Sequence, residues 1–399
     1  MNKKIIALLM VIIVLLACAT LAISFDKKKS NDLYRQVELF SDVLAVVDTD
    51  YVDEVKPKDL IYGALKGMLS SLDPHSQFMD ADTYNELKSD TEGQFGGLGI
   101  EISLKDGLLT IITPIEDTPA WQAGLKAGDR IVKVNNQLTR GIDLSEAMKK
   151  LRGKPGEIVK LTILRESEKK LLEFSITRAI IKINDIKEAK VLEGGIGYIR
   201  MLEFRDNTPK DFNAAIKKLV KLKMDSLILD LRNNPGGVLE SALEITGKFI
   251  PEGKLIAYTK GRKENQNLQF KAQAKHPMLN LPMVILINEG SASGSEILAG
   301  ALQDYKRAVI LGEKSFGKGS VQTVIPLSDG SALRLTTSKY FTPSGKIIHG
   351  KGVIPDLVVS NGIKKEKDEG PWEYKSDLQV MAAVNLIKKG IALPLRGSQ

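Results

Sequence analysis

Apolar positions near the start of the chain recur three or four residues apart in two stretches. This spacing is typical of the buried faces of helices. The first stretch consists of Leu33, Val37, Phe40, Leu44 and Val47, and the second of Leu60, Ala64, Met68 and Leu72. We therefore expect a helical N-terminal region over residues 26–93, with two helices joined around Tyr51–Pro57.

The pattern changes between residues 94 and 178, where short apolar runs are separated by turn residues. One stretch in this region, Leu144–Leu151, keeps a clear helical spacing. Short strands with frequent turns predict a separate β-rich domain. This domain opens on the glycine-rich run Gly96–Ile100.

Strands and helices alternate between residues 179 and 362. The expected strands are Ile196–Met201, Ser226–Asp230 and Met283–Ile287, and the expected helices are Pro209–Leu222 and Val238–Phe249. Strands separated by helices of this length predict an α/β core with a largely parallel sheet and right-handed crossovers. Residues 363–399 add a charged linker, 363–370, and a last helix, Asp377–Lys388. The whole chain is thus expected to have an α+β multidomain fold.

The first 25 residues differ sharply from the rest. Lys3 and Lys4 precede a mostly apolar, uncharged run over residues 5–25. A run of this length can span a bilayer, and it exceeds the usual apolar core of a cleaved signal peptide. We therefore expect export, with residues 5–25 kept as an anchor in a bacterial inner membrane and the rest of the chain in the periplasm or cell envelope. Cleavage at Ala17-Cys18-Ala19 and lipidation of Cys18 remain alternatives.

Charge and residue counts argue against some classes of function, namely nucleic-acid binding and metal or cofactor chemistry. The chain has 57 basic and 49 acidic residues, and its net charge is +8. The basic residues are interspersed with acidic ones, which favours solubility and contact with anionic lipid over binding of nucleic acid. Cys18 is the only cysteine and there are three histidines, so we expect no metal site and no cofactor.

Candidate chemistry begins in the stretch Asn288–Asp304. Turn residues follow the apolar strand Met283–Ile287, and a helix is expected at Ser295–Gln303. Ser293 would lie in this turn, where backbone N–H groups and the helix dipole stabilise negative charge. An acyl-transfer enzyme needs its nucleophile and oxyanion site in such a place. The alternative is structural, because Ser293 and Glu296 also fit a helix capping box.

A second candidate is Lys318, which lies between Gly317 and Gly319 after the strand Ala308–Leu311. A serine hydroxyl is a weak nucleophile until a base takes its proton. A lysine can act as that base only if burial away from carboxylates lowers its pKa from ~10.4 to roughly 7 or 8. Gln322 is suited to orient such a lysine without charging it.

Several motifs resemble those of the C-terminal processing, or tail-specific, serine peptidases. They are Ser291–Glu296, Ala299–Asp304, Phe316–Gln322 and Gly350–Asp356. The resemblance extends over nearly the whole chain from Leu33 to Leu386. It implies a serine endopeptidase with a crotonase-like core, in which Ser293 is the nucleophile, Lys318 the general base and Gln322 its neighbour. Gly294 departs mildly from the pattern, since many members have alanine there, but both residues supply the same N–H.

The turn Asp230–Gly237 resembles the oxyanion loop of that family. It follows a predicted strand at the carboxyl end, where open α/β sheets place their sites. Because Pro235 has no N–H, we expect Gly236 to donate to an oxyanion together with Gly294. A plain strand-to-helix turn is the alternative.

The β-rich region 94–178 resembles a PDZ domain, because it contains both Gly96–Ile100 and Ala123–Asp129. In such a domain the glycine-rich loop binds a peptide's terminal carboxylate while the peptide adds to the sheet as a strand. The expected substrate-binding residues are Gly96, Gly97, Leu98, Gly99 and Ile100. The implied partners are proteins with exposed C-terminal tails, and the resemblance leaves open a homo-oligomer formed by the N-terminal helices and a regulatory partner protein.

Other functions fit the sequence less well. A Ser-His-Asp triad requires a histidine, and His75 lies in a predicted turn with a structural role. A phosphate-binding loop ending at Lys318 would need serine or threonine where Gly319 stands. A PDZ scaffold without catalysis is the main alternative, although it has no use for Ser293, Lys318 and Gln322 together. A crotonase-like acyl enzyme would need a coenzyme pocket.

Overall fold

The computed structural model describes residues 33–105, 107–166, 168, 170–273, 279–360 and 374–390. The predicted anchor at residues 5–25 and the predicted linker at 363–370 lie outside these residues. Among the helices that the structure does describe, none is both long and apolar enough to cross a membrane.

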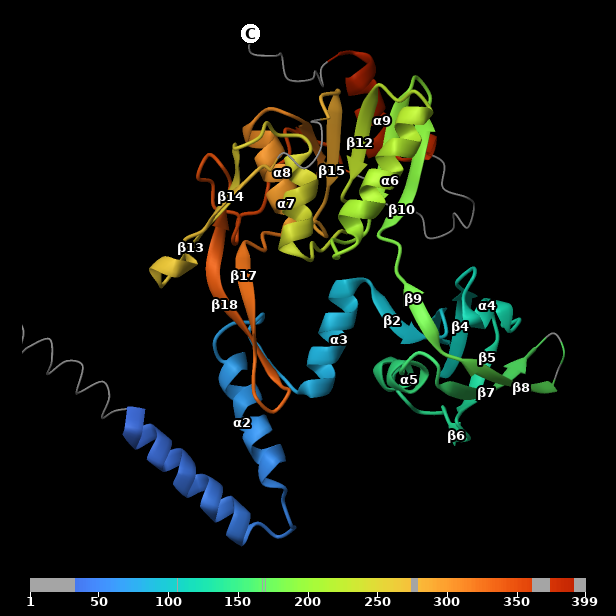
Figure 1. Ribbon diagram of the computed structural model, residues 1–399, viewed down its shortest axis with the longest axis vertical. Helices are drawn as coiled ribbons and strands as arrows, with labels where there is room; N and C mark the ends of the chain where they lie inside the picture. Colours follow the sequence, from blue (N-terminus) through green and yellow to red (C-terminus); the bar gives the residue numbers. More distant parts are fainter. Residues whose placement is uncertain are drawn as a thin grey trace, which may run out of the picture. The chain divides into compact units, whose positions relative to one another are not determined.

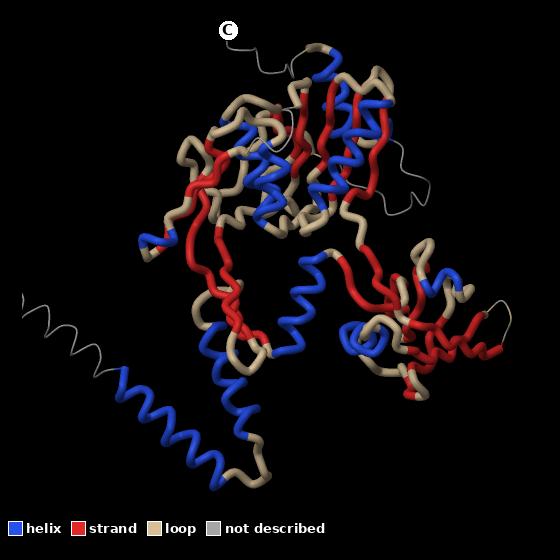
Figure 2. The backbone as a smooth tube through the Cα atoms, viewed as in Figure 1, coloured by secondary structure: helices blue, strands red, loops and turns tan. Residues whose placement is uncertain are grey.

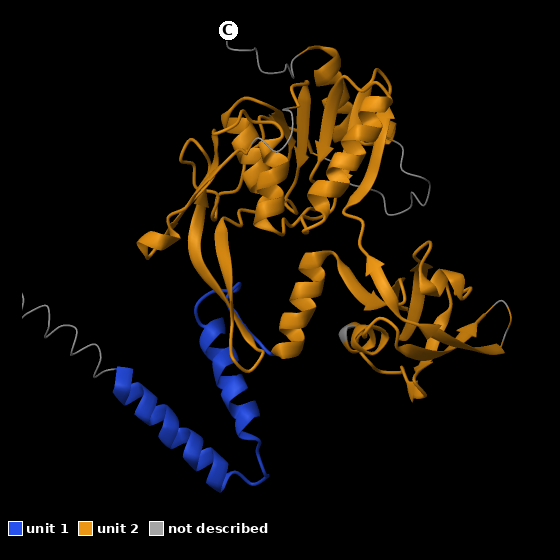
Figure 3. Cartoon of the chain, in the orientation of Figure 1, with its two compact units in different colours: residues 1–80 blue, residues 81–399 orange. Residues whose placement is uncertain are grey.

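The chain divides into two compact units, residues 1–80 and 81–399 (Figure 3). The first unit contains the two predicted helices, one over residues 33–50 and α2 at Pro57–Ser70, followed by the short strand β1 at Gln77–Met79. The ring of Tyr62 on α2 meets Phe78 of β1 edge to face, with 4.7 Å between ring centroids. The helix over 33–50 leaves most of its apolar side chains exposed.

The second unit begins with α3 (Ala81–Glu92), which leads into a β-rich domain. A two-stranded antiparallel ribbon, β2 (Gln94–Gly97) with β9 (Ala179–Lys182), holds the start and the end of this domain together. Between them lies an antiparallel sheet in the order β3-β4-β5-β7-β8, with β6 paired to β5. Figure 1 labels β4 to β8 of this sheet. Its strands are β3 (Ile100–Lys105), β4 (Leu108–Pro114), β5 (Arg130–Val134), β6 (Gln137–Leu138), β7 (Ile158–Arg165) and β8 (Lys170–Thr177).

Two helices complete the β-rich domain, α4 (Pro119–Gln122) and α5 (Leu144–Leu151). The second matches the single helix predicted from the sequence. Asp143 caps α5 by accepting the N–H of Glu146 at 2.7 Å. The domain has its own apolar core, which includes Leu109, Ile131 and Ile163.

The predicted parallel sheet is present as a six-stranded sheet in the order β10-β11-β12-β15-β16-β19. Its pairs are parallel except β10 with β11, which is antiparallel. The strands are β10 (Ile186–Leu192), β11 (Ile196–Met201), β12 (Ser226–Asp230), β15 (Met283–Ile287), β16 (Val309–Gly312) and β19 (Leu357–Val358). The three central predicted strands thus have the expected bounds.

Helices cover both faces of this sheet (Figures 1 and 2). One face packs against α6 (Thr208–Lys221), α7 (Leu239–Gly247) and α8 (Gly294–Asp304), and the other against α9 (Leu378–Lys388). Successive strand residues alternate between the two layers: Leu227 and Leu229 face the first layer and Ile228 the second. The strand β12 is therefore buried on both sides, which explains its continuous apolar run.

A further antiparallel sheet was not foreseen as a unit. It contains β14, β13, β18 and β17 in that order. The strands are β13 (Leu255–Gly261), β14 (Gln269–Lys271), β17 (Ser320–Pro326) and β18 (Ala332–Phe341), and the short helices η1 (Glu264–Gln266) and η2 (Tyr374–Ser376) complete the described elements. Among the strands that the structure describes, parallel pairs occur in the core sheet and antiparallel pairs predominate overall. The crotonase-like character of the core stays a prediction.

Candidate active site

Ser293 lies in the tight turn between β15 and α8, as predicted. Its backbone has φ 51° and ψ −112°, a combination that residues with a side chain rarely adopt. Such a conformation costs of order 1–3 kcal/mol and is held only by its surroundings. A strained serine at a strand-to-helix turn is also how a nucleophile is exposed in the α/β hydrolases. A serine that only capped the helix would have no need of this strain, so the geometry favours the catalytic alternative.

Neighbouring residues fix this turn to the loop after β12. Ser291 Oγ donates to Leu231 O at 2.8 Å, and the N–H of Ala292 donates to Asn234 O at 3.0 Å. Ser295 Oγ donates to the same carbonyl of Asn234, also at 3.0 Å. The hydroxyls around Ser293 thus hold its backbone in place.

Glu296 connects the serine turn to the lysine loop. Its carboxylate accepts the N–H groups of Ser293 at 2.9 Å, Gly317 at 2.7 Å and Lys318 at 2.9 Å. It also accepts Ser315 Oγ at 2.5 Å. Burial raises the pKa of Glu296, while these hydrogen bonds act in the opposite direction. The capping box predicted from Ser293 and Glu296 captured one of these four contacts.

Lys318 is half-buried, and this burial lowers the pKa of its ammonium group. The positive charge of Arg334 on β18 lowers it further. No carboxylate of the described residues forms an ion pair with Lys318. A lysine in this environment gives up its proton more readily than one in water, as a general base must.

Gln322 lies on β17, four residues after Lys318. Its side-chain nitrogen donates to Ser320 Oγ at 2.8 Å and to Thr336 Oγ1 at 3.4 Å. A hydrogen bond from Gln322 to Lys318 is not among those of the described residues. The role predicted for Gln322 in orienting the lysine therefore stays a prediction.

The predicted oxyanion loop is packed directly against the turn that holds Ser293. A Cβ atom built on Gly236 would lie 2.7 Å from the backbone N of Gly294 and 2.7 Å from Ser293 Cβ. On Gly237 it would lie 2.0 Å from Phe204 O. Both glycines also have positive φ values, 97° and 133°. A side chain on Gly236 would collide with the turn that holds Ser293, and one on Gly237 would collide with the backbone of Phe204.

The backbone donors of this loop differ in their availability. The N–H of Gly236 donates to Asn234 Oδ1 at 2.9 Å. Within the part of the chain that is described, the N–H groups of Gly237 and Gly294 have no acceptor. Gly294 thus fits its predicted role, donation from Gly236 stays a prediction, and Gly237 is a candidate donor that the sequence did not single out.

A buried ion-pair network holds the start of the same loop. The guanidinium of Arg232 bonds Asp230 Oδ2 at 2.6 Å and Asp377 Oδ2 at 2.8 Å. Tyr198 Oη donates to Asp230 Oδ2 at 2.7 Å, and Gln379 Oε1 accepts from Arg232 at 2.9 Å. Asp377 is the N-cap of α9, so the C-terminal helix helps to hold the predicted oxyanion loop.

The β-rich domain contains a groove of about 340 Å³ between β3 and α5. β3 is the edge strand of its sheet, so its outer side is open to another strand. Of the five residues predicted to bind substrate, Gly97, Leu98, Gly99 and Ile100 line the groove, whereas Gly96 packs against Gly153 instead. Their role in binding substrate stays a prediction. No acceptor is present within the described residues for the N–H groups of Leu98 and Gly99.

Comparison with known proteins decides the family. A carboxy-terminal-processing protease of Bartonella bacilliformis is 41% identical over 401 residues, which cover 92% of both chains. The chain belongs to the carboxy-terminal-processing proteases. The carboxy-terminal processing protease CtpB of Bacillus subtilis is 34% identical over 367 residues, which cover 90% of this chain and 75% of that protein.

Three protein-family descriptions match separate parts of this protease. Residues 195–359 match peptidase family S41, and residues 110–165 match the PDZ domain. Residues 18–83 match the N-terminal domain of the activating protease CtpB. The fold is also similar to that of a solved putative S41 protease from Bacteroides fragilis, with a TM-score of 0.51 at 18% identity over 86% of this chain and 92% of that one. The protease therefore combines a serine-type peptidase domain with a PDZ domain, as the sequence motifs predicted.

Two histidines, His75 and His349, differ in their surroundings. The backbone N–H of His75 donates to Asp73 Oδ1 at 2.8 Å, in line with the structural role predicted for its turn. The backbone of His349 packs against the lysine loop, because a Cβ on Gly319 would lie 2.2 Å from the backbone N of His349. Its Nδ1 is buried and has no hydrogen-bond partner in the described part of the chain. His349 is thus the histidine to test beside Lys318.

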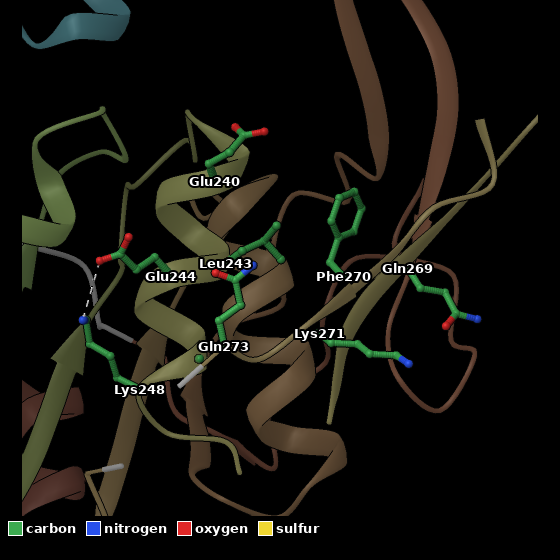
Figure 4. A pocket seen from close by; sticks show the side chains of 9 residues that line it. Glu240, Leu243, Glu244, Lys248, Gln269, Phe270, Lys271 and Gln273 are labelled. Atoms are coloured by element: carbon green, nitrogen blue, oxygen red, sulfur yellow. Dashed lines mark ion pairs between the residues drawn. The ribbon is translucent and has the colours of Figure 1, made fainter. Parts of the chain in front are cut away.

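The protease has a further groove, of about 240 Å³, between α7 and β14 (Figure 4). Leu243 and Phe270 form its apolar part. At one end Glu244 forms an ion pair with Lys248 at 3.8 Å. Neither Ser293 nor Lys318 lines this groove, so it is distinct from the site of the predicted catalytic residues.

Proposed function

We propose that this protease captures the C-terminal tails of proteins with its PDZ domain and cuts the adjoining chain with a Ser293/Lys318 dyad. The observation that carries the dyad is the carboxylate of Glu296, which bonds the backbone N–H of both residues. The strained backbone of Ser293 and the lowered pKa of Lys318 support the same assignment.

In the proposed reaction, neutral Lys318 takes the proton of Ser293 Oγ as that oxygen attacks the carbonyl carbon of the scissile bond. The tetrahedral intermediate collapses when the C–N bond breaks and the lysine returns its proton to the leaving amine. Water then attacks the acyl carbon and gives one proton to Lys318. The bond between that carbon and Ser293 Oγ breaks, the acid product leaves, and Lys318 returns the proton to Ser293 Oγ. The lysine ends each half-reaction in its neutral form, so nothing else is consumed.

The negative charge on the intermediate's oxygen needs backbone donors beside Ser293. The N–H of Gly294 lies at the N-terminal end of α8, where the helix dipole adds to the stabilisation. Its partner comes from the loop of Gly236 and Gly237, which packs against it. Removing one donor of this kind typically costs about 10²–10³ in rate.

Tail capture is proposed for the groove between β3 and α5. The free N–H groups of Leu98 and Gly99 suit a terminal carboxylate, and the apolar side chains of Ile100, Met148 and Leu151 suit an apolar last residue. The open edge of β3 supplies backbone partners for the residues that precede it.

Location and assembly belong to the same proposal. The apolar run at residues 5–25 supports an exported protease anchored in the inner membrane, with substrates in the bacterial envelope. The exposed apolar side chains of the helix over residues 33–50 support a homo-oligomer formed through the N-terminal unit. A regulatory partner protein remains part of the proposal.

The decisive experiment follows cleavage of an unfolded reporter with an apolar free C-terminus across pH. We expect the wild-type rate to rise through one pKa below that of free lysine, and Ser293→Ala and Lys318→Ala to be inactive while still binding the tail. Activity retained by Lys318→Ala would refute the dyad, and His349→Ala would then test whether His349 is the base. Equal cleavage of a reporter with an amidated C-terminus would refute capture of the carboxylate.

A further inference from the structure

The tail-binding groove has one acidic side chain on its strand side, Glu101. It lies on β3 between Ile100 and Ile102, and all three residues line the groove. Successive side chains of a strand point to opposite faces. Ile100 and Ile102 are half-buried and pack against the domain core, whereas Glu101 is exposed. The strand thus presents an apolar face toward the core and a carboxylate on the other face.

Strand addition fixes which tail residue meets which side chain. A tail that runs antiparallel to β3, with its carboxylate at the N–H groups of Leu98 and Gly99, places its last residue opposite Ile100. The penultimate residue then lies opposite Glu101, and the third residue from the end lies opposite Ile102. Directly opposite side chains in an antiparallel pair lie on the same face, with Cβ atoms about 4.5–5.5 Å apart. The penultimate side chain therefore projects beside the carboxylate of Glu101.

The surroundings of Glu101 leave its charge available for a substrate. Its neighbour across the β3–β4 pair is Thr113, which is uncharged. Across the described part of the chain no lysine or arginine forms an ion pair with Glu101. The nearest cation along the same face of β3 is Lys105, four residues away. A positive side chain on the bound tail would be the first partner of this carboxylate.

We infer that Glu101 selects tails in which lysine or arginine is the penultimate residue and stands between two apolar residues. The inference rests on the proposed capture of tails in this groove and adds a sequence preference to it. An opposite-charge pair across two strands is a modest interaction, so the preference is one of affinity. It is exposed to solvent and weakens as salt is added.

The test is peptide binding to the full chain with Ser293→Ala, which prevents cleavage. The probes are fluorescent octapeptides with leucine at the last and third-last positions and lysine, glutamine or glutamate between them, measured by anisotropy at low ionic strength. We expect the lysine peptide to bind about two- to five-fold more tightly than the glutamine peptide, and the glutamate peptide to bind most weakly. Glu101→Gln should remove this order, and Glu101→Lys should reverse it.

The matched control is Glu173→Gln, which removes the same charge from β8 at the opposite edge of the sheet. It should leave the order of the three peptides unchanged. An order that persists in Glu101→Gln, or the absence of any order in the protein with Glu101, overturns the inference. If free tails bind more tightly than amidated ones but without this order, the selection by Glu101 fails and tail capture stands. If amidated and free tails bind equally, tail capture fails and the inference fails with it.

Discussion

The substitution Glu296→Gln tests whether one carboxylate holds the nucleophile and the base together. Oε1 of Glu296 accepts from Ser315 and Gly317, and Oε2 accepts from Ser293 and Lys318. A glutamine keeps one oxygen and turns the other position into a donor. Whichever way the amide is oriented, two donors lose their acceptor and face an NH₂ group.

The expected cost follows from these contacts. A hydrogen bond to a charged group contributes about 1.5–3 kcal/mol, so two lost bonds amount to about 3–6 kcal/mol. Part of this is offset, because burial of the Glu296 charge is itself unfavourable and raises its pKa. We therefore expect a net loss of about 2–4 kcal/mol, which lowers the melting temperature by about 5–15 °C in a domain of this size. The domain should still fold, because typical stabilities are about 5–15 kcal/mol.

Activity should fall further than stability suggests. A displacement of about 1 Å between reacting groups can cost about 10²-fold in rate. We expect Glu296→Gln to lose about that factor in kcat for the tailed reporter, at a temperature where thermal unfolding shows it folded, and to keep its tail affinity. The control is Glu289→Gln, an exposed acid in the same turn. A Glu296→Gln variant with kcat within a factor of two of wild type would refute the role given to this carboxylate.

Three further predictions concern the same site. Arg334→Gln removes a positive charge that lowers the pKa of Lys318, so the pKa should rise and the rise of kcat/KM with pH should move to higher pH; an unchanged profile would contradict this. Ser293→Gly relieves a positive φ, and it should melt higher than the equally inactive Ser293→Ala, by an amount equivalent to about 1 kcal/mol in calorimetry. Asp377→Asn weakens a buried hydrogen bond to Arg232, so it should lower the free energy of unfolding by about 2–4 kcal/mol and also lower kcat. A variant that lost only tail affinity would contradict this position of Asp377.

The sequence predicted most of the core elements because their patterns are local. The strand Met283–Ile287 is an uninterrupted apolar run, and Leu144–Leu151 has a helical spacing, so each is recognised without knowledge of its neighbours. The antiparallel sheet of β13, β14, β17 and β18 was harder to foresee. Most of β17 is exposed, so its pattern does not show a buried face, and its pairing depends on distant strands.

In the candidate site, too, features with a local sequence pattern could be predicted and those that depend on distant residues could not. Ser293 and Lys318 were found from glycine-rich motifs, since small residues allow backbone segments to approach each other. The pair of Arg232 with Asp377 joins residues 145 positions apart, and no local pattern indicates it. The positive φ of Ser293 could not be predicted either, because the sequence around it fits a helix capping box as well as a turn that exposes a nucleophile. A strained backbone becomes visible only once the flanking strand and helix are placed.

The unpaired edge of β3 has a consequence for solubility. Edge strands are where sheets of separate molecules join and aggregate, and most proteins cover or charge them. Here the helix α5 packs beside β3, and the space between them is a groove of about 340 Å³. A helix beside an edge strand is one of the ways in which proteins cover such an edge. The position of α5 therefore hinders the edge-to-edge joining of folded copies, even though β3 itself has no neighbouring strand on that side.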